Sequence, residues 1–345
     1  MVLCKPLSAA AQAAFADLVP AAQQFELDRS AADLPGGFTS KTIRGRTYWY
    51  YQVKRPDGQP RQIYIGPEGP AARALVDTHR DSPARELGHE HLRRLARAAI
   101  ALGCAEVSPT HGRIIGRLLD HGFFRAGGIL IGTHAFIAYQ NHLGLRWDAG
   151  TRTQDLDFAH PGRNLSIAMP SGWAVDTSAA IDTLKMGFVP NVAGTTFTKA
   201  DEPDLQLDFV TSRVAADDRP IRIDDLGLSL QPLKFMEYSM EHTFTGVLLT
   251  RTGPLVVQLP DPQRFALHKL IVHGERTRSL RIKAEKDLQQ AAALIEWSAE
   301  HDPHALAAAR DDLLSRGKDW QSRLERGVAA LGHRHPGLWT RALAS

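Results

Sequence analysis

Three aspartates in strand-like segments carry the most distinctive chemistry of this sequence. Asp155 and Asp157 are two positions apart in residues 153–158, which alternate polar and apolar side chains as a half-buried strand does. Side chains two positions apart on a strand point to the same face, so both carboxylates are presented together. Asp208 lies in a similar segment, residues 205–210. If the two strands pair, the three carboxylates converge, and oxygen ligands of this kind bind Mg²⁺ and support phosphoryl transfer.

Gly132 and Thr133 mark a turn between a strand and a helix. Residues 128–131 form a short apolar run, and residues 134–143 have helical character. Glycine allows a phosphate to approach the backbone, and the first turn of a helix offers N–H groups without intrahelical partners. We therefore predict that Gly132 and Thr133 contact a phosphate group, which the resemblance described below implies to belong to a nucleotide.

The elements that must position these residues follow from periodicity and turn residues. Apolar residues at helical spacing predict helices over residues 9–15, 19–25, 83–103, 111–121 and 178–186, and over most of the chain after about residue 262. Besides the two acidic strands, alternating segments predict strands over residues 47–53, 61–66, 246–250 and 254–259. The first two of these predict a β-hairpin or a three-stranded meander.

Residues 41–61 combine aromatic side chains with six basic residues and only one acid, Asp57. On one interpretation the rings form a small β core and the basic residues keep its exposed face soluble. On the other, the segment is a nucleic-acid platform, because aromatic rings stack on bases and cations neutralise phosphates. The second interpretation assigns nucleic-acid binding to Arg44, Arg46, Tyr48, Trp49 and Arg61.

Composition excludes several classes of protein. The 345 residues are 43% hydrophobic and 23% charged, which excludes a disordered, collagen-like or coiled-coil chain. The net charge of +3 is too small for a protein that coats nucleic acid by charge alone. The longest apolar run is too short to span a membrane and the first residues lack a secretory signal, so we expect a cytoplasmic protein. Cys4 and Cys104 cannot build a disulfide framework.

Taken in order, three motifs resemble the DNA polymerase β-like nucleotidyltransferase superfamily. They are Ile131-Gly132-Thr133, Asp155-Leu156-Asp157 and Asp208. Residues 262–270 and 283–288 further resemble segments of the AbiEii-type nucleotidyltransferase toxins, which carry a lysine and then a basic–Asp pair on helices after the catalytic sheet. The resemblance covers about residues 110–295. It departs from the pattern at Thr133, where Ser or Gly is usual, and in the 23 positions from Gly132 to Asp155, a longer spacing than usual.

The resemblance implies an α/β (α+β) fold with a mixed, mainly antiparallel nucleotidyltransferase-type sheet covered by helices. Together with the composition of each segment it predicts four regions. These are an N-terminal helical arm and basic aromatic β module (1–70), bridging helices (71–109), a catalytic domain (110–260) and a C-terminal helical region (261–345).

The resemblance also implies an activity, namely Mg²⁺-dependent transfer of a nucleoside monophosphate from an NTP to a hydroxyl of RNA, such as tRNA, or of protein. It implies a toxin that an antitoxin protein would neutralise. Asp155, Asp157 and Asp208 would hold two Mg²⁺ ions, and Asp208 would help to deprotonate the acceptor. Lys269 is either a solvated helix residue or a ligand of the triphosphate, and Asp287 either pairs with Lys283 along a helix or lies in the active site. The alternative is a non-catalytic RNA- or protein-binding module on the same fold.

Overall fold

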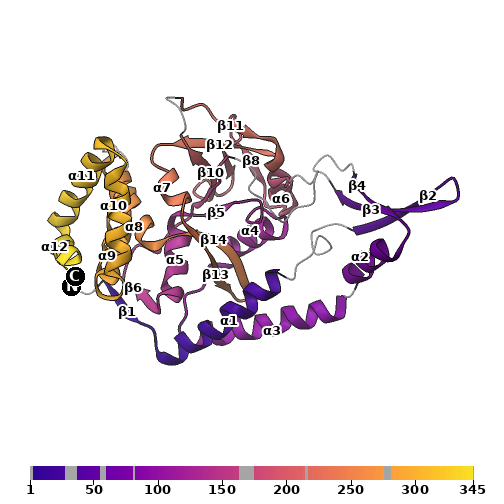
Figure 1. Cartoon of the computed structure of the whole chain (residues 1–345), viewed down its shortest axis with the longest axis horizontal. Helices are drawn as coiled ribbons and strands as arrows, with labels where there is room; N and C mark the ends of the chain where they lie inside the picture. The colour runs from indigo at the N-terminus through magenta and orange to yellow at the C-terminus, as the bar shows by residue number, and fades with distance from the viewer. Residues whose placement is uncertain are drawn as a thin grey trace.

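A computed structural model of the chain describes residues 3–27, 37–54, 60–80, 82–162, 175–213, 217–275 and 281–344. The molecule is elongated, with a central sheet and its helices in the middle of the long axis (Figure 1). A small three-stranded sheet projects at one end, and helices from the C-terminal part of the chain lie at the other. This is the predicted α/β (α+β) class.

The central sheet has seven strands and is mixed. Its main path runs through β11 (Ile221–Ile223), β12 (Leu228–Leu233), β10 (Gln206–Ser212), β7 (Leu156–Ala159) and β5 (Ile129–Leu130), and β10 also pairs with β9 (Thr196–Lys199), which pairs with β8 (Phe188–Pro190). β10 is parallel to both β7 and β12, whereas the other pairings are antiparallel. The predicted mixed, mainly antiparallel sheet is confirmed, with its parallel pairings at the centre.

The alternation predicted for the acidic strands is seen in their burial. Phe158 of β7 and Phe209 of β10 are buried, and their rings stack with centroids 5.2 Å apart. Asp157 and Asp208 precede these rings and are directly opposite each other in the parallel register. Because successive side chains on a strand point to opposite faces, the two carboxylates lie on the face away from this aromatic core.

Several elements cover the central sheet. Four helices and one 3₁₀ turn belong to this group: α4 (Pro109–Asp120), α5 (Gly132–His142), α6 (Thr177–Thr183), α7 (Glu237–Met240) and η2 (Asp224–Leu226). The hairpin of β13 (Thr243–Thr250) and β14 (Gly253–Pro260) packs against α5, and on its other side against α1 (Ala9–Leu27) and α3 (Ser82–Ala101). β1 (Cys4–Pro6) pairs with β6 (Leu145–Trp147). The first helix therefore packs with the central unit, through α3 and the β13–β14 hairpin.

The basic aromatic segment forms a three-stranded meander, one of its two predicted forms. It consists of β2 (Gly37–Ile43), β3 (Arg46–Lys54) and β4 (Pro60–Pro67), followed by α2 (Pro70–Arg80). Arg44 and Gly45 both have positive φ angles, as a tight two-residue hairpin turn requires. Tyr51 is buried, and the Trp49 indole donates to Glu68 (2.7 Å). The Phe38 and Tyr51 rings pack edge-on, with centroids 5.1 Å apart, whereas Tyr64 is 56% exposed.

The C-terminal helices stack on one another and on the central unit. They are α8 (Pro262–Glu275), α9 (Arg281–His301), α10 (Pro303–Ser315), α11 (Lys318–Arg334) and α12 (Leu338–Ala344). α8 is packed between α9 and α11, so its position depends on both neighbours. Within the described ranges, no helix is long and apolar enough to cross a membrane.

Gly327 sets how closely α11 approaches α8. A Cβ at this position would overlap the carbonyl oxygen of Leu270 and lie 2.8 Å from its Cβ, whereas a Cβ at Gly332 of the same helix would meet nothing within 4 Å. We expect Gly327→Ala to lower the free energy of unfolding by about 1–3 kcal/mol, as overpacking does. Gly332→Ala should raise it by up to about 1 kcal/mol, because alanine favours the helix. Urea unfolding of both variants checks this, and equal effects would contradict it.

Candidate active site

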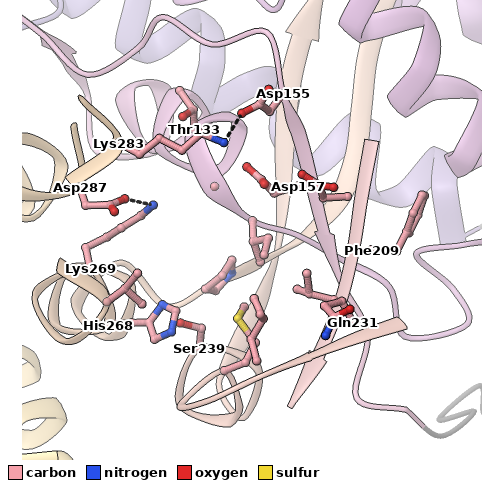
Figure 2. A pocket seen from close by; sticks show the side chains of 18 of the residues that line it. Thr133, Asp155, Asp157, Phe209, Gln231, Ser239, His268, Lys269, Lys283 and Asp287 are labelled. Atoms are coloured by element: carbon pink, nitrogen blue, oxygen red, sulfur yellow. Dashed lines mark hydrogen bonds and ion pairs between the residues drawn. The ribbon is translucent and has the colours of Figure 1, made fainter. Parts of the chain in front are cut away.

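A cavity of about 450 Å³ lies between the carboxylate face of the central sheet and helices α8 and α9 (Figure 2). This volume is in the range of small-molecule sites. Every residue predicted for metal or nucleotide binding lines it, namely Gly132, Thr133, Asp155, Asp157, Asp208, Lys269 and Asp287. The fold thus brings together residues that are up to 155 positions apart in sequence.

Asp157 and Asp208 form the centre of the cavity. The Thr196 hydroxyl, from the neighbouring strand β9, donates to Asp208 (2.6 Å). Burial raises the pKa of Asp208, against the effect of that hydrogen bond. Burial also raises the pKa of Asp157, against the nearby ammonium of Lys269 and with a further increase from Asp208. Each ionised carboxylate therefore destabilises the other, and the pair favours a cation between them.

Gly132 places the start of α5 against Asp157. Its φ angle is +62°, in the left-handed region that favours glycine. A Cβ here would overlap Asp157 Oδ2 and lie 2.8 Å from Cγ. The N–H of Ile131 donates to the Asp157 backbone oxygen (3.0 Å), which fixes the strand end beside the helix. The amino terminus of α5 and the carboxylate are therefore in contact only because residue 132 has no side chain.

The long connection between Gly132 and Asp155 is tied back to the site. The Gln290 amide on α9 donates to the Gly150 carbonyl oxygen (2.8 Å) and to the Thr133 hydroxyl (3.4 Å). Behind Thr133, His134 is buried against His111, and burial lowers the pKa of His134 to about 3. Gln290 thus ties the connection, at Gly150, to the start of α5, and the buried His111–His134 pair packs behind it.

Cations from α8 and α9 face the carboxylates. Lys269 is largely buried and donates to Asp287 (2.7 Å), so it is not a solvated helix residue. Lys283 pairs with Asp155 (3.0 Å). It does not form the predicted alternative pair with Asp287 along its own helix. Figure 2 shows both ion pairs on the same side of the cavity.

Lys286 also lines the cavity and was not predicted as a site residue. Within the described part of the chain it makes no hydrogen bond or ion pair. Burial lowers its pKa, and the positive charge of Lys269 lowers it further. Its place directly before Asp287, in the segment that resembles the basic–Asp pair, was the sequence signal that could have identified it.

The carboxylates fit a divalent cation in part. Asp155 lies just before β7, which begins at Leu156 rather than at the predicted residue 153, and its carboxylate is engaged by Lys283. Among the described residues, no three His, Cys, Asp or Glu side chains are grouped closely enough to hold a metal ion. Asp157, however, accepts no side-chain hydrogen bond from the described residues. Carboxylates of this kind are the ligands that Mg²⁺ takes.

The residues predicted to bind nucleic acid lie elsewhere. None of them lines the cavity, and the three-stranded sheet that carries them projects from the central unit (Figure 1). Arg44 and Arg46 are exposed, and Tyr48 and Trp49 are half-buried. Arg61 lies on β4, and its side chain is outside the described residues.

Comparison with known proteins gives one match. A sequence profile of a family described as Nucleotidyltransferase matches residues 109–315, more than half of the chain. The matched range contains every predicted residue of the cavity and excludes the three-stranded sheet. No curated protein and no solved structure matches. The closer resemblance to AbiEii-type toxins stays a prediction.

The raised pKa of Asp157 makes a prediction about stability. We expect Asp157→Asn to raise the unfolding temperature at pH 7. The substitution removes a negative charge that burial and the neighbouring carboxylates make unfavourable in the folded state. An aspartate in an unfolded chain ionises near pH 4. The advantage of the variant should therefore be absent below about pH 4 and should grow as the pH rises through the higher pKa of the folded state.

Thermal unfolding between pH 3.5 and 8, without added divalent cations, measures this difference. Asp204→Asn is the matched control, since Asp204 is exposed and does not line the cavity. Surface substitutions of this kind usually change stability by less than about 0.5 kcal/mol. A variant at Asp157 that is less stable than the wild type at pH 7 would show that the carboxylate is favourable to the fold.

Proposed function

We propose that this chain, which belongs to the nucleotidyltransferase family, transfers a nucleoside monophosphate from an NTP to a hydroxyl of an RNA acceptor. Transferase activity and an NTP substrate follow from the family, whereas the acceptor is our proposal. One observation supports nucleotidyl transfer at this cavity. Asp157 and Asp208 lie opposite each other on parallel strands, with the amino terminus of α5 on one side and lysines of α8 and α9 on the other.

The chain's own residues account for binding of the triphosphate. The amino terminus of α5 offers N–H groups and a positive dipole end to an anion. Lys269 and Lys286 supply positive charge on the opposite wall, and Asp287 orients Lys269 through their ion pair. Fixed donors of this kind also stabilise charge that develops on the leaving pyrophosphate.

Asp208 is suited to accept the proton of the acceptor hydroxyl. Burial raises its pKa above the ordinary value of an aspartate, and a higher pKa makes a carboxylate a stronger general base. As the acceptor oxygen bonds to the α-phosphorus, its proton passes to Asp208. The bond from the α-phosphorus to the bridging oxygen breaks, and pyrophosphate leaves with that electron pair.

Asp157 and Asp208, with Asp155, would hold Mg²⁺. Bound there, the ion would neutralise the phosphates and stabilise the attacking and leaving oxygens. The lack of a side-chain hydrogen bond to Asp157 supports this assignment, since a paired cation would satisfy the carboxylate.

The three-stranded sheet supports RNA as the acceptor. Arg44 and Arg46 are exposed on it, and the Lys41 ammonium lies 5.1 Å from the centre of the Tyr50 ring. Exposed cations beside aromatic rings are the combination that binds single-stranded nucleic acid. The sheet lies outside the matched family range, so it would add acceptor binding to a catalytic unit that handles the NTP.

The activity is tested with each of the four labelled NTPs, total RNA, lysate protein and Mg²⁺. We expect label on RNA, and a loss of about a hundredfold or more for Asp157→Asn and for Asp208→Asn, as when a transition-state contact of a few kcal/mol is removed. Asp204→Asn should keep wild-type activity. Label on protein alone would replace RNA as the acceptor, and no label on either would favour a non-catalytic binding module.

Mg²⁺ binding has its own measurement. Because a ligand that binds only the folded state raises its stability, Mg²⁺ should raise the unfolding temperature of the wild type. Asp157→Asn should lose most of this rise, and Asp204→Asn should keep it. An equal rise in all three proteins would contradict the metal assignment.

Removing three positive charges from the three-stranded sheet should weaken binding of the RNA acceptor without changing binding of the NTP. The variant carries Arg44→Gln, Arg46→Gln and Arg61→Gln. Each arginine that no longer neutralises an RNA phosphate should lower the slope of log affinity against log salt by roughly one unit. RNA affinity and NTP affinity are measured across a salt series.

A control with the same loss of charge carries Arg94→Gln, Arg146→Gln and Lys318→Gln, at exposed positions outside this sheet. It should keep the wild-type RNA affinity and salt slope. If both triple variants behave alike, net charge and not the three-stranded sheet binds the acceptor.

A further inference from the structure

We infer that the end of the cavity away from the carboxylates binds the base of the NTP, and that Ser239 distinguishes one base from another. This inference rests on the proposed function, which places the triphosphate at the charged end. It adds a base subsite and a specificity-determining residue.

The two ends of the cavity differ in chemistry. In Figure 2, Thr133, Asp155 and Lys283 lie at one end, and Ser239 and Gln231 lie at the other. The charged end carries the aspartates, the lysines and the amino terminus of α5. The far end has apolar walls that include Val210, which is opposite Gln231 in the sheet register, and Met236, whose backbone oxygen accepts from the N–H of Ser239; both are buried. His268 also lies beside Ser239 at this end (Figure 2). A flat, largely apolar ring with polar edges fits this end, and a phosphate does not.

Ser239 places a polar group in that apolar environment. Its side chain is 2% exposed and lines the cavity, and its hydroxyl has no hydrogen-bond partner in the described part of the chain. A buried hydroxyl without a partner is unfavourable, so a ligand that satisfies it gains selectivity over one that does not. The nucleobases present different donors and acceptors on their edges, and a serine hydroxyl can serve either kind.

The segment before Ser239 is held in a strained conformation. Phe235 has a φ angle of +65°, although it is not glycine. Its ring packs edge-on against Trp320, with centroids 4.6 Å apart, and the Arg323 guanidinium lies over it at 4.7 Å. Such strain persists where the surroundings enforce it, often beside a ligand site. Here it directs the chain from β12 into α7, the short helix that carries Ser239.

Gln231 adds a polar amide to the same end (Figure 2). Its side-chain nitrogen donates to the Asp218 backbone oxygen (3.0 Å), which fixes the amide. The amide oxygen remains an acceptor, for which the described residues supply no donor. A fixed acceptor and an adaptable hydroxyl together read a base edge better than either group alone.

The test compares Ser239→Ala with the wild type for ATP, CTP, GTP and UTP. For each NTP, kcat/KM is measured in the transfer assay and the dissociation constant by calorimetry. We expect the ratio between the preferred NTP and the others to change by about tenfold, the usual effect of leaving a buried polar group unpaired. An equal loss for all four NTPs, or no change, would overturn the inference.

Ser298→Ala is the matched control. Ser298 is also a buried serine without a hydroxyl partner among the described residues, but it does not line the cavity. Its removal should leave the preference among the four NTPs unchanged. A shift equal to that of Ser239→Ala would mean that the effect comes through the fold, and the inference would be wrong.

Inorganic triphosphate separates the two ends of the cavity, because it has no base. Its inhibition constant should be unchanged in Ser239→Ala and several-fold weaker in Lys269→Ala. Weaker inhibition in Ser239→Ala would place Ser239 at the phosphates and overturn the base assignment. If the wild type binds and transfers NTPs but Ser239→Ala keeps its preference, only this inference fails. If the wild type binds no NTP, the proposed function fails with it.

Discussion

The repulsion between Asp157 and Asp208 is the constraint on which the rest of the structure depends. The parallel pairing of β7 with β10 puts these two residues directly opposite each other, on a face that helices then cover. Burial raises the pKa of both carboxylates, and the charge of Asp208 raises the pKa of Asp157 further. Positive groups around the cavity offset this repulsion. They are the amino terminus of α5 and lysines on α8 and α9.

The C-terminal helices are therefore part of the site and not an addition to it. α9 and α11 pack on α8 and hold Lys269 at the cavity, where it pairs with Asp287, and Gly327 allows α11 to approach α8 closely. The first residues of the chain contribute as well. β1 pairs with β6 in the long connection after α5, and the N–H of Leu3 donates to Glu296 on α9 (2.7 Å). Elements from both ends of the sequence thus fix the positions of the cations relative to the carboxylates.

The three-stranded sheet stands apart from this arrangement. Its rings pack on each other, with Tyr51 buried, and α2 links it to the helix α3 that packs on the central unit. A separate module of this kind can change its binding properties without disturbing the balance of charge in the cavity. The match of the family to residues 109–315 alone agrees with this division.

The sequence by itself determined the local parts of the site. Period-2 alternation predicted the strands around Asp157 and Asp208, and Gly132 predicted the turn, because both signals depend only on neighbouring residues. The tertiary structure alone decided which strands are parallel and that Lys283 meets Asp155, 128 positions away. It also decided that Lys286 and Ser239 reach the same cavity. These contacts depend on how helices pack against a sheet, and periodicity within one segment carries no information about its distant neighbours.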